Sequence, residues 1–566
     1  CTVRMSANKT VRAVFARTTA TTFRLTVTGA GDGSGTVASQ AGLAPAIACG
    51  LSGGSPSGAC SADYPGGTSV TLTATPAAGH TFTGWSGACA GTGACTVSLG
   101  ASLAVTAGFA APPGPEARTG RWSSPQGTPI VGLHLSLLPS GNAVLWGHGG
   151  EPQVWNAQGG SFTQRANTGC GDPLGCELFC SGHTVLADGR LLVAGGHDEA
   201  RGNHHGLTQS SIFDGDGWQP AGSMHYPRWY PTLVALGDGD VVALSGSQTS
   251  GVNASIPERW NGSGWTALTG ADQTLPNYPR AFVEPKQGHV FVARGVQSRV
   301  LDPNGSGSWS PGPTPLVADR NYGAAVMLDG KLLFAGGGGR TCPGLPERSA
   351  EIIDLSAPSP TWALTGSMAV ARRQLNLTIL PDGSVLATGG TSACGHSDES
   401  GAVFSAELWD PGTGQWATLA SASVIRVYHS TAVLLPDGRV LSMGGGDGGG
   451  VTPQRTSEVF SPPYLFKGDR PDYDLPNTAM RYGQPFTVST ADAASIRKVT
   501  IIRLPSTTHA FNMGQRLNTL PFEVTAGGPT ITPPAAGRIA PPGPYLLFLV
   551  NEAGVPSVAQ TVMLSS

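Results

Sequence analysis

Leu434-Leu435-Pro436-Asp437-Gly438-Arg439-Val440 is the stretch of sequence that decides the fold. An apolar strand runs into an Asp-Gly turn, and a second apolar strand follows and ends at Gly444-Gly445. Asp-Gly supplies the positive φ that a tight hairpin requires, so the stretch predicts two antiparallel strands.

The same unit recurs between residues 120 and 465 with a period of roughly 50 residues. Its copies turn at Gly141, Gly189, Gly239, Gly288, Gly330, Gly383 and Gly438. A Trp-bearing strand pair follows most copies, as at Trp218, Trp265, Trp309, Trp362 and Trp416. Four strands per unit at this period are typical of a kelch-type propeller blade. Seven turns therefore predict a seven-bladed kelch propeller, and a strand at Gly120-Arg121-Trp122 can complete its last blade.

Composition supports an all-β protein. The 566 residues include 82 Gly and 45 Pro but few charged residues, which favours many short strands joined by tight turns. The net charge of −3 offers no basic surface for nucleic acid and no polybasic face for a membrane. No apolar run is long enough to span a bilayer.

The chain divides into five predicted segments. Cys1-Thr2-Val3 repeats Cys95-Thr96-Val97 in register, so residues 1–16 are interpreted as the tail of a truncated repeat, and a targeting signal can lie upstream. Residues 17–110 form one small β repeat domain, and the Pro-rich residues 111–119 form a linker. Residues 120–465 form the propeller. Residues 466–566 predict an immunoglobulin-like β-sandwich.

The repeat domain carries an alternating strand at 69–74 and the motif Gly84-Trp85-Ser86-Gly87. It resembles secreted bacterial repeat domains with that motif and a Cys pattern. The resemblance implies a stalk or adhesive spacer that contacts a cell surface or a glycan.

The ten cysteines are interpreted as mostly paired. Cys49 and Cys60, Cys89 and Cys95, Cys170 and Cys176, and Cys342 and Cys394 are four pairs that could form disulfides. Cys1 and Cys180 are left over. Paired cysteines at this density suggest an oxidising setting, so we expect a secreted or cell-surface protein of bacterial type.

Four motifs precede blade turns or lie in the sandwich: Phe179-Cys180-Ser181-Gly182, Arg228-Trp229-Tyr230-Pro231, Arg426-Val427-Tyr428-His429-Ser430 and Thr507-Thr508-His509. In this order they resemble the galactose oxidase and glyoxal oxidase family of copper-radical oxidases. The residues of the Arg-Trp-Tyr-Pro motif are more similar to those of glyoxal oxidases. The resemblance implies one copper ion bound by Tyr230, Tyr428, His429 and His509. It also implies a protein-derived radical cofactor made by a thioether between Cys180 and Tyr230.

The family implies a two-electron oxidation of a primary alcohol or small aldehyde, with O₂ reduced to hydrogen peroxide. Tyr428 would be the general base, and the Tyr230–Cys180 radical would remove a hydrogen atom from the substrate carbon. Nitrogen and phenolate oxygen donors suit Cu(II).

Each of these residues also has a structural interpretation. A lone buried Cys is usually core filler, and a Tyr beside a Pro is often blade packing. Tyr428 and His429 can reach one ion only if the chain bends at the start of the strand, because neighbouring strand residues face opposite ways.

The sequence leaves open which substrate is used and whether the protein is an enzyme or a binding protein. Phe179, Gln248 and Arg320 are candidates for the substrate pocket. Gln248 matches by offset the Trp that galactose oxidases place over the linked Tyr-Cys pair, so small aldehydes or simple alcohols are favoured over galactose. The histidines His197, His204 and His205 share one loop, for which a solvated loop is favoured over a metal-binding one. The alternative function is a non-catalytic propeller that binds glycan or protein, because fold alone cannot separate a binder from an enzyme.

Overall fold

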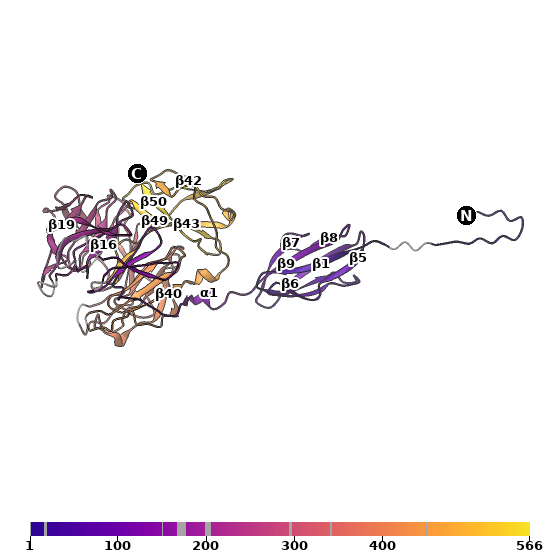
Figure 1. Cartoon of the computed structure of the whole chain (residues 1–566), viewed down its shortest axis with the longest axis horizontal. Helices are drawn as coiled ribbons and strands as arrows, with labels where there is room; N and C mark the ends of the chain where they lie inside the picture. The colour runs from indigo at the N-terminus through magenta and orange to yellow at the C-terminus, as the bar shows by residue number, and fades with distance from the viewer. Residues whose placement is uncertain are drawn as a thin grey trace. The chain divides into compact units, whose positions relative to one another are not determined.

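The computed structural model describes residues 2–15, 20–149, 151–166, 177–198, 205–293, 297–339, 342–448 and 450–566. It contains two compact units, Cys1–Gly114 and Pro115–Ser566 (Figure 1). Strands dominate both units, and the helices of the described residues are α1 (Glu116–Thr119), η2 (Glu399–Gly401), η3 (Pro463–Phe466) and η4 (Ala493–Ser495). None of these helices has the length or hydropathy needed to cross a membrane. The chain is therefore all-β, as predicted. The finer divisions of the second unit stay predictions.

The first unit is built from two sheets. One has the order β5-β1-β9-β7, with β1 (Thr22–Ala30), β5 (Ser61–Pro65), β7 (Thr81–Gly87) and β9 (Leu103–Ala110). The other has the order β4-β3-β2-β6-β8, with β2 (Ser34–Ser39), β3 (Ala48–Ser52), β4 (Ser55–Ala59), β6 (Ser69–Pro76) and β8 (Cys95–Ser98). The predicted alternating strand forms as β6, whose Val70 and Leu72 are buried while Ser69 and Thr73 are exposed. Leu25, Val37 and Trp85 join them in one core.

Three of the four predicted cysteine pairs are confirmed as disulfides, namely Cys49–Cys60, Cys89–Cys95 and Cys342–Cys394. Cys180 is free and buried, as predicted. Cys1, Cys170 and Cys176 lie outside the described residues.

The second unit repeats one sheet pattern seven times. The first sheet contains β12 (His134–Leu137), β13 (Ala143–Trp146), β14 (Gln153–Trp155) and β15 (Phe162–Gln164), and the second contains β16 (Gly182–Val185), β17 (Leu191–Ala194), β18 (Leu207–Phe213) and β19 (Trp218–Arg228). The third contains β20 (Thr232–Ala235), β21 (Val241–Leu244), β24 (Glu258–Trp260) and β25 (Trp265–Ala267). The fourth contains β26 (Arg280–Val283), β27 (Val290–Ala293), β28 (Arg299–Asp302) and β29 (Ser308–Pro311).

The fifth sheet contains β30 (Ala324–Leu328), β31 (Lys331–Ala335), β32 (Ala350–Asp354) and β33 (Trp362–Thr365). The sixth contains β34 (Asn376–Ile379), β35 (Val385–Thr388), β36 (Ser405–Trp409) and β37 (Trp416–Ser421). The seventh contains β38 (Ser430–Leu434), β39 (Val440–Gly444), β40 (Thr456–Ser461) and β10 (Arg121–Trp122). Short strands β11 (Gln126–Gly127), β22 (Ser247–Thr249) and β23 (Val252–Asn253) flank them. The predicted strand at Gly120-Arg121-Trp122 thus pairs with β40 through Arg121 and Trp122.

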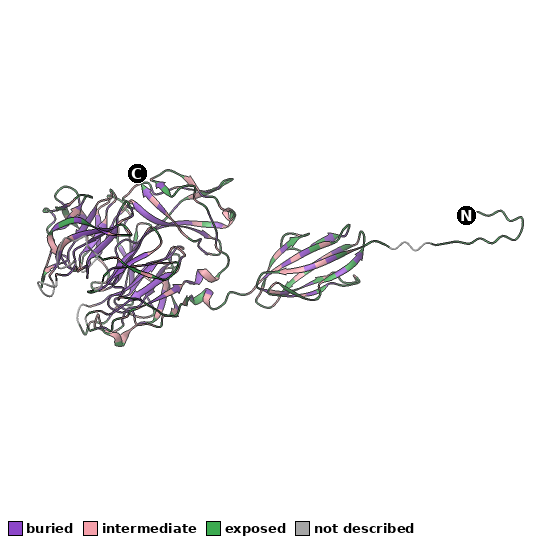
Figure 2. Ribbon diagram, viewed as in Figure 1, coloured by how far each residue is buried: buried purple, intermediate pink, exposed green. Residues whose placement is uncertain are grey.

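Each of the seven repeats turns between its first two strands at a glycine with positive φ. The values at Gly141, Gly189, Gly239, Gly288, Gly330, Gly383 and Gly438 lie between 78° and 99°. Glycine adopts this backbone without a steric penalty, which is why the turn signal could be read directly from the sequence. The first two strands of each sheet are almost wholly buried (Figure 2). Side chains from adjacent sheets therefore pack together into continuous hydrophobic cores.

Two further sheets follow residue 478. One runs in the order β46-β43-β49-β50-β41 and continues from β30, with β41 (Ala479–Arg481), β43 (Ile496–Arg503), β46 (Arg516–Thr519), β49 (Gly543–Asn551) and β50 (Gln560–Ser565). The other has the order β42-β48-β47, with β42 (Phe486–Thr487), β47 (Phe522–Thr525) and β48 (Gly528–Ile531). Ile501, Leu547 and Ile531 lie in a core that the two sheets share.

A hairpin from this C-terminal region reaches the seven-sheet repeat. It consists of β44 (Ser506–Thr508) and β45 (Phe511–Asn512), and β44 pairs with β12, the first strand of the first sheet. The Thr507 hydroxyl donates to the carbonyl of Ala432, and the Thr508 hydroxyl donates to the carbonyl of Leu133. Hydrogen bonds to two different sheets fix the tip of the hairpin, and His509 is at that tip.

Candidate functional site

Six sheets begin with the same unusual backbone feature. A residue with positive φ stands one or two positions ahead of the first strand, namely Cys180 (59°), Tyr230 (67°), Tyr278 (46°), Tyr322 (58°), Gln374 (60°) and His429 (69°). Non-glycine residues adopt this conformation at a cost of about 1–3 kcal/mol each, and such strain clusters at functional sites. Backbone hydrogen bonds connect neighbours: the N–H of Tyr230 donates to Cys180 and that of Tyr278 donates to Tyr230, at 2.8 and 2.9 Å. We call these six residues the left-handed set.

Four buried ion pairs fix the chain just before this set. Arg228, Arg320, Arg372 and Arg426 pair with Glu258, Glu351, Glu407 and Glu458, respectively. The Arg320 guanidinium lies 2.7 Å from Glu351 and also donates to the carbonyls of Gly336 and Ser349. The Arg320 side chain therefore stabilises the segment that leads to Tyr322, and its place in a substrate pocket stays a prediction.

The bend required at Tyr428-His429 is present. The positive φ of His429 breaks the strand alternation, and the two neighbouring rings lie 3.6 Å apart on the same side of the chain. The Tyr428 hydroxyl is 2.8 Å from the Tyr230 hydroxyl.

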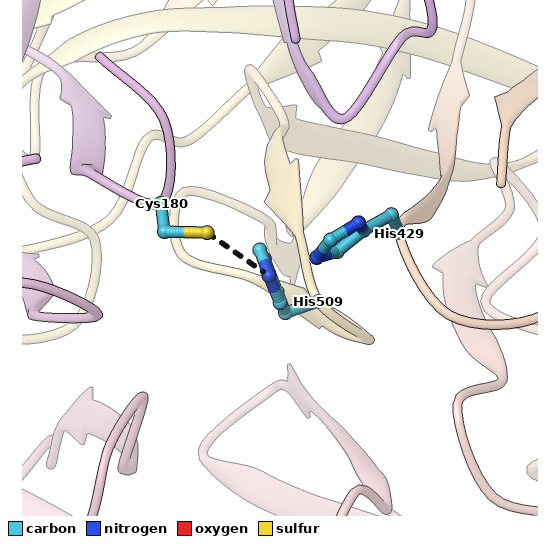
Figure 3. Close-up of side chains that lie close together, drawn as sticks. All are labelled: Cys180, His429 and His509. Atoms are coloured by element: carbon cyan, nitrogen blue, oxygen red, sulfur yellow. Dashed lines mark hydrogen bonds between the residues drawn. The ribbon is translucent and has the colours of Figure 1, made fainter. Parts of the chain in front are cut away.

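His509 completes the group. Its ring centroid lies 4.5 Å from that of His429 and 4.9 Å from that of Tyr230, and its Nε2 is 3.4 Å from the Cys180 sulfur. Figure 3 shows Cys180, His429 and His509 approaching one another from three separate segments. The donor atoms of these three residues lie within 4.8 Å of one another.

Both imidazoles are oriented by their Nδ1 atoms. His429 Nδ1 lies 2.7 Å from the carbonyl of Gly446, and His509 Nδ1 lies 2.6 Å from the hydroxyl of Thr508. A carbonyl only accepts, so His429 Nδ1 carries the proton and Nε2 presents a lone pair. Within the described residues that buried Nε2 has no hydrogen-bond partner.

Burial governs the electrostatics of the site. It lowers the pKa of His429 to about 3 and that of His509 well below its usual value, so both rings are neutral at physiological pH. It raises the pKa values of Tyr230 and Tyr428 well above their usual value. A cation reverses that effect on the phenols by stabilising the phenolate. Neutral imidazoles, two phenols and an unpartnered nitrogen therefore fit a copper ion.

Aromatic rings enclose the group. The Trp229 ring lies 4.3 Å from that of Tyr230, and Phe179 meets His429 edge-on at 5.7 Å. Gln248 is half-buried, and its carbonyl accepts the N–H of Gly206. The aromatic ring beside Tyr230 in this part of the site is that of Trp229, and the place of Gln248 in a substrate pocket stays a prediction.

Two more residues of the site escaped the sequence analysis. The Tyr278 ring lies 5.0 Å from Tyr230 and 4.8 Å from His509, and its hydroxyl donates to the carbonyl of Ser181. The pair Tyr278-Pro279 repeats Tyr230-Pro231, so a signal for it was available. His396 lies 5.1 Å from Tyr428 in an irregular loop and had no such signal.

In the histidine loop between β17 and β18 of the second sheet, His197 differs from expectation. His197 is buried, and its ring stacks on that of Trp229 at 5.0 Å, so it is not a solvated residue. His204 lies outside the described residues.

Two regions of the chain match known protein families. Residues 470–564 match the family described as "Galactose oxidase-like, Early set domain", and residues 48–113 match the "Divergent InlB B-repeat domain". The chain is 30% identical to the galactose oxidase of Gibberella zeae over 508 residues, which cover 79% of this chain and 71% of that protein. It is 28% identical to the protein named Aldehyde oxidase GLOX from Vitis pseudoreticulata, covering 69% of this chain and 82% of that one.

Solved structures extend the similarity. One described as a "Novel fungal alcohol oxidase with catalytic diversity among the AA5 family, in complex with copper" superposes with a TM-score of 0.71 at 26% identity. The match covers 79% of this chain and the whole of that chain.

Proposed function

The chain belongs to the galactose oxidase family of copper-radical oxidases, and from that premise we propose that it oxidises small aldehydes or simple primary alcohols at the site around Tyr428. The products are the oxidised carbon compound and hydrogen peroxide. The convergence of Tyr230, Tyr428, His429 and His509 is the observation that supports this assignment.

The proposed ligands of the copper ion are Tyr230, Tyr428, His429 and His509. The proposed partner of Tyr230 in the radical cofactor is Cys180, a free buried cysteine whose hydrophobic cluster also contacts Tyr230. When bound, copper and the linked Tyr-Cys pair supply the two oxidising equivalents that an alcohol oxidation needs.

Several residues of the chain accept a proton from the substrate, orient the proposed ligands or exclude water. Tyr428 Oη accepts the proton of the substrate hydroxyl as general base, and it is positioned for this by the bend at His429. Gly446 and Thr508 hold the two imidazoles in orientation. Trp229 and Phe179 exclude water from the rings beneath them, as expected for residues that are 8% and 7% exposed.

We also propose how the seven sheets are arranged and where the protein is located. The first strands β16, β20, β26, β30, β34 and β38 lie side by side in that order, and β38 lies beside β12. This order of first strands supports a closed seven-bladed kelch propeller with β10 in its last blade. The two C-terminal sheets with their shared core support an immunoglobulin-like sandwich. The three disulfides support a secreted or cell-surface protein, in which the first unit contacts a surface or glycan.

A peroxide assay tests the function. Copper-loaded protein is given a panel of small aldehydes, simple primary alcohols and galactose, and the expected order places galactose last. Tyr428→Phe should abolish peroxide release while retaining part of the copper binding, because the general base is lost but three ligands remain. Undiminished turnover by this variant would rule out Tyr428 as the base.

A further inference from the structure

A loop beside Tyr428 carries a histidine with no assigned role. Residues 391–402, here called the clamp loop, follow β35 and place His396 between two tyrosines. The His396 ring stacks on that of Tyr322 with centroids 5.1 Å apart and planes 17° apart. It meets Tyr428 edge-on, at 5.1 Å and 88°.

The clamp loop is held from several sides. A disulfide joins Cys394 to Cys342, which lies in the loop that follows β31 of the neighbouring sheet. The N–H and the hydroxyl of Thr452 both donate to the Glu399 carboxylate at 3.0 Å. Thr391 forms isolated β-bridges with Arg373 and Ala402. These contacts fix the base of the loop, so His396 is presented at a defined place.

The surroundings of His396 differ from those of His429 and His509, the two histidines proposed as copper ligands. Its ring is half-buried, and its nitrogen atoms form no hydrogen bond with any residue that the structure describes. Tyr322 stacks on one face of the imidazole, and the ring remains partly exposed. A neutral imidazole offers one hydrogen-bond donor and one acceptor to a molecule that reaches it.

We propose that His396 binds a second hydroxyl of the substrate, on the carbon next to the one that is oxidised. The favoured substrates are then vicinal diols and 2-hydroxy aldehydes. This inference rests on the proposed function, in which the first hydroxyl gives its proton to Tyr428, and it adds a second anchoring point next to that phenol.

Two alcohols that differ by one hydroxyl test the assignment. 1,2-Propanediol carries the second hydroxyl and 1-propanol does not. In wild-type protein kcat/KM should favour the diol. His396→Phe keeps the flat contact with Tyr322 but removes both nitrogens, so it should lower the diol-to-propanol ratio of kcat/KM about tenfold or more, mainly through KM.

Variants separate binding from packing. His396→Gln, which restores a donor and an acceptor, should recover part of the ratio. His289→Phe changes a histidine that lies 3.5 Å from Asp302, outside the site, and should leave the ratio as in wild type. A ratio that is the same in wild type and His396→Phe, or equal losses for both alcohols, would overturn the proposal.

Binding to copper-free protein gives a readout without turnover. Ligand-observed NMR should show 1,2-propanediol binding to wild type about tenfold more tightly than to His396→Phe, with no such difference for 1-propanol. If copper-loaded wild type releases no peroxide but this difference persists, the oxidase function fails and the hydroxyl subsite stands. If peroxide is released and the difference is absent, the function stands and the subsite fails.

Discussion

Tyr428 and His429 are neighbours whose rings lie 3.6 Å apart, which a regular strand does not permit. The positive φ of His429 resolves the conflict, and five other residues of the left-handed set share it. The surrounding hydrogen bonds and ion pairs stabilise this strained backbone. At the scale of single residues, the site therefore depends on conformations that the rest of the fold imposes.

Cys180 provides the most direct test at this scale. Copper loading in air should join its sulfur to Tyr230 and lower the intact mass by the hydrogens lost. Cys180→Ala should show no such change, because no thiol is present. An unchanged wild-type mass, with the disulfides accounted for, would contradict the cross-link.

Tyr278 should act as a positioning residue. Tyr278→Phe removes the hydrogen bond from its hydroxyl to Ser181, the residue after Cys180, but keeps the ring against Tyr230. We expect a loss of about 1 kcal/mol in stability and slower formation of the cross-link, followed by intact mass over time.

Tyr473→Phe is the matched control for Tyr278→Phe. The Tyr473 hydroxyl donates to the carbonyl of Leu547 within the C-terminal core. This variant should lose stability without slowing the cross-link. Equal cross-linking rates in all three proteins would refute a positioning role for Tyr278.

Most residues that the sequence proposed for the site stand in recurring positions, whereas His509 was proposed from the family resemblance alone. Tyr230, Tyr428 and Cys180 stand at fixed places ahead of a blade turn, so periodicity and family order identified them. Arg320 occupies a similar place, yet its partner Glu351 is 31 residues away, and only the structure reveals the pair. His396 depends on an irregular loop and a distant disulfide, which no periodicity encodes.

At the scale of elements, the buried Arg–Glu pair is a repeated device. It connects the segment ahead of a first strand to the third strand of the same sheet in four of the seven sheets. The hairpin β44–β45 is different, because its partners are distant in sequence: Thr508 donates to Leu133, 375 residues earlier, and Thr507 donates to Ala432, 75 residues earlier. The strand pattern predicted the sheets, but not where this hairpin would lie.

Breaking one buried pair should be costly. Glu351→Gln leaves the Arg320 charge buried without a counterion, which should lower the free energy of unfolding by about 3–5 kcal/mol, measured by urea denaturation. Glu552→Gln, in the exposed pair with Arg497, should have no measurable effect. Similar midpoints for the two variants would contradict a stabilising role for the buried pair.

At the scale of the whole molecule, the second unit buries several histidines in neutral form. Burial lowers the pKa of His183 and of His429 to about 3, while an unfolded chain titrates near 6.5. Below pH 6.5 the unfolded state takes up protons that the folded state does not. The contribution of these rings is therefore complete above pH 6.5 and is lost progressively as the pH falls toward 3.

Copper-free protein should show this loss directly. Between pH 7.5 and pH 5 each of these two histidines should reduce stability by about 2 kcal/mol, which urea titrations at both values measure. His183→Leu should make the dependence shallower. Equal unfolding midpoints at the two pH values would show that the rings are protonated in the folded state.

The hairpin that delivers His509 also sets a biosynthetic order. The ribosome makes the other site residues before this hairpin, namely Cys180, Tyr230, Tyr428 and His429. The imidazole of His509 joins them only when β44 has paired with β12. A chain that ends before residue 509 lacks one of the four proposed copper ligands. Assembly of the proposed copper site therefore waits until translation has passed residue 509 and the late hairpin has inserted.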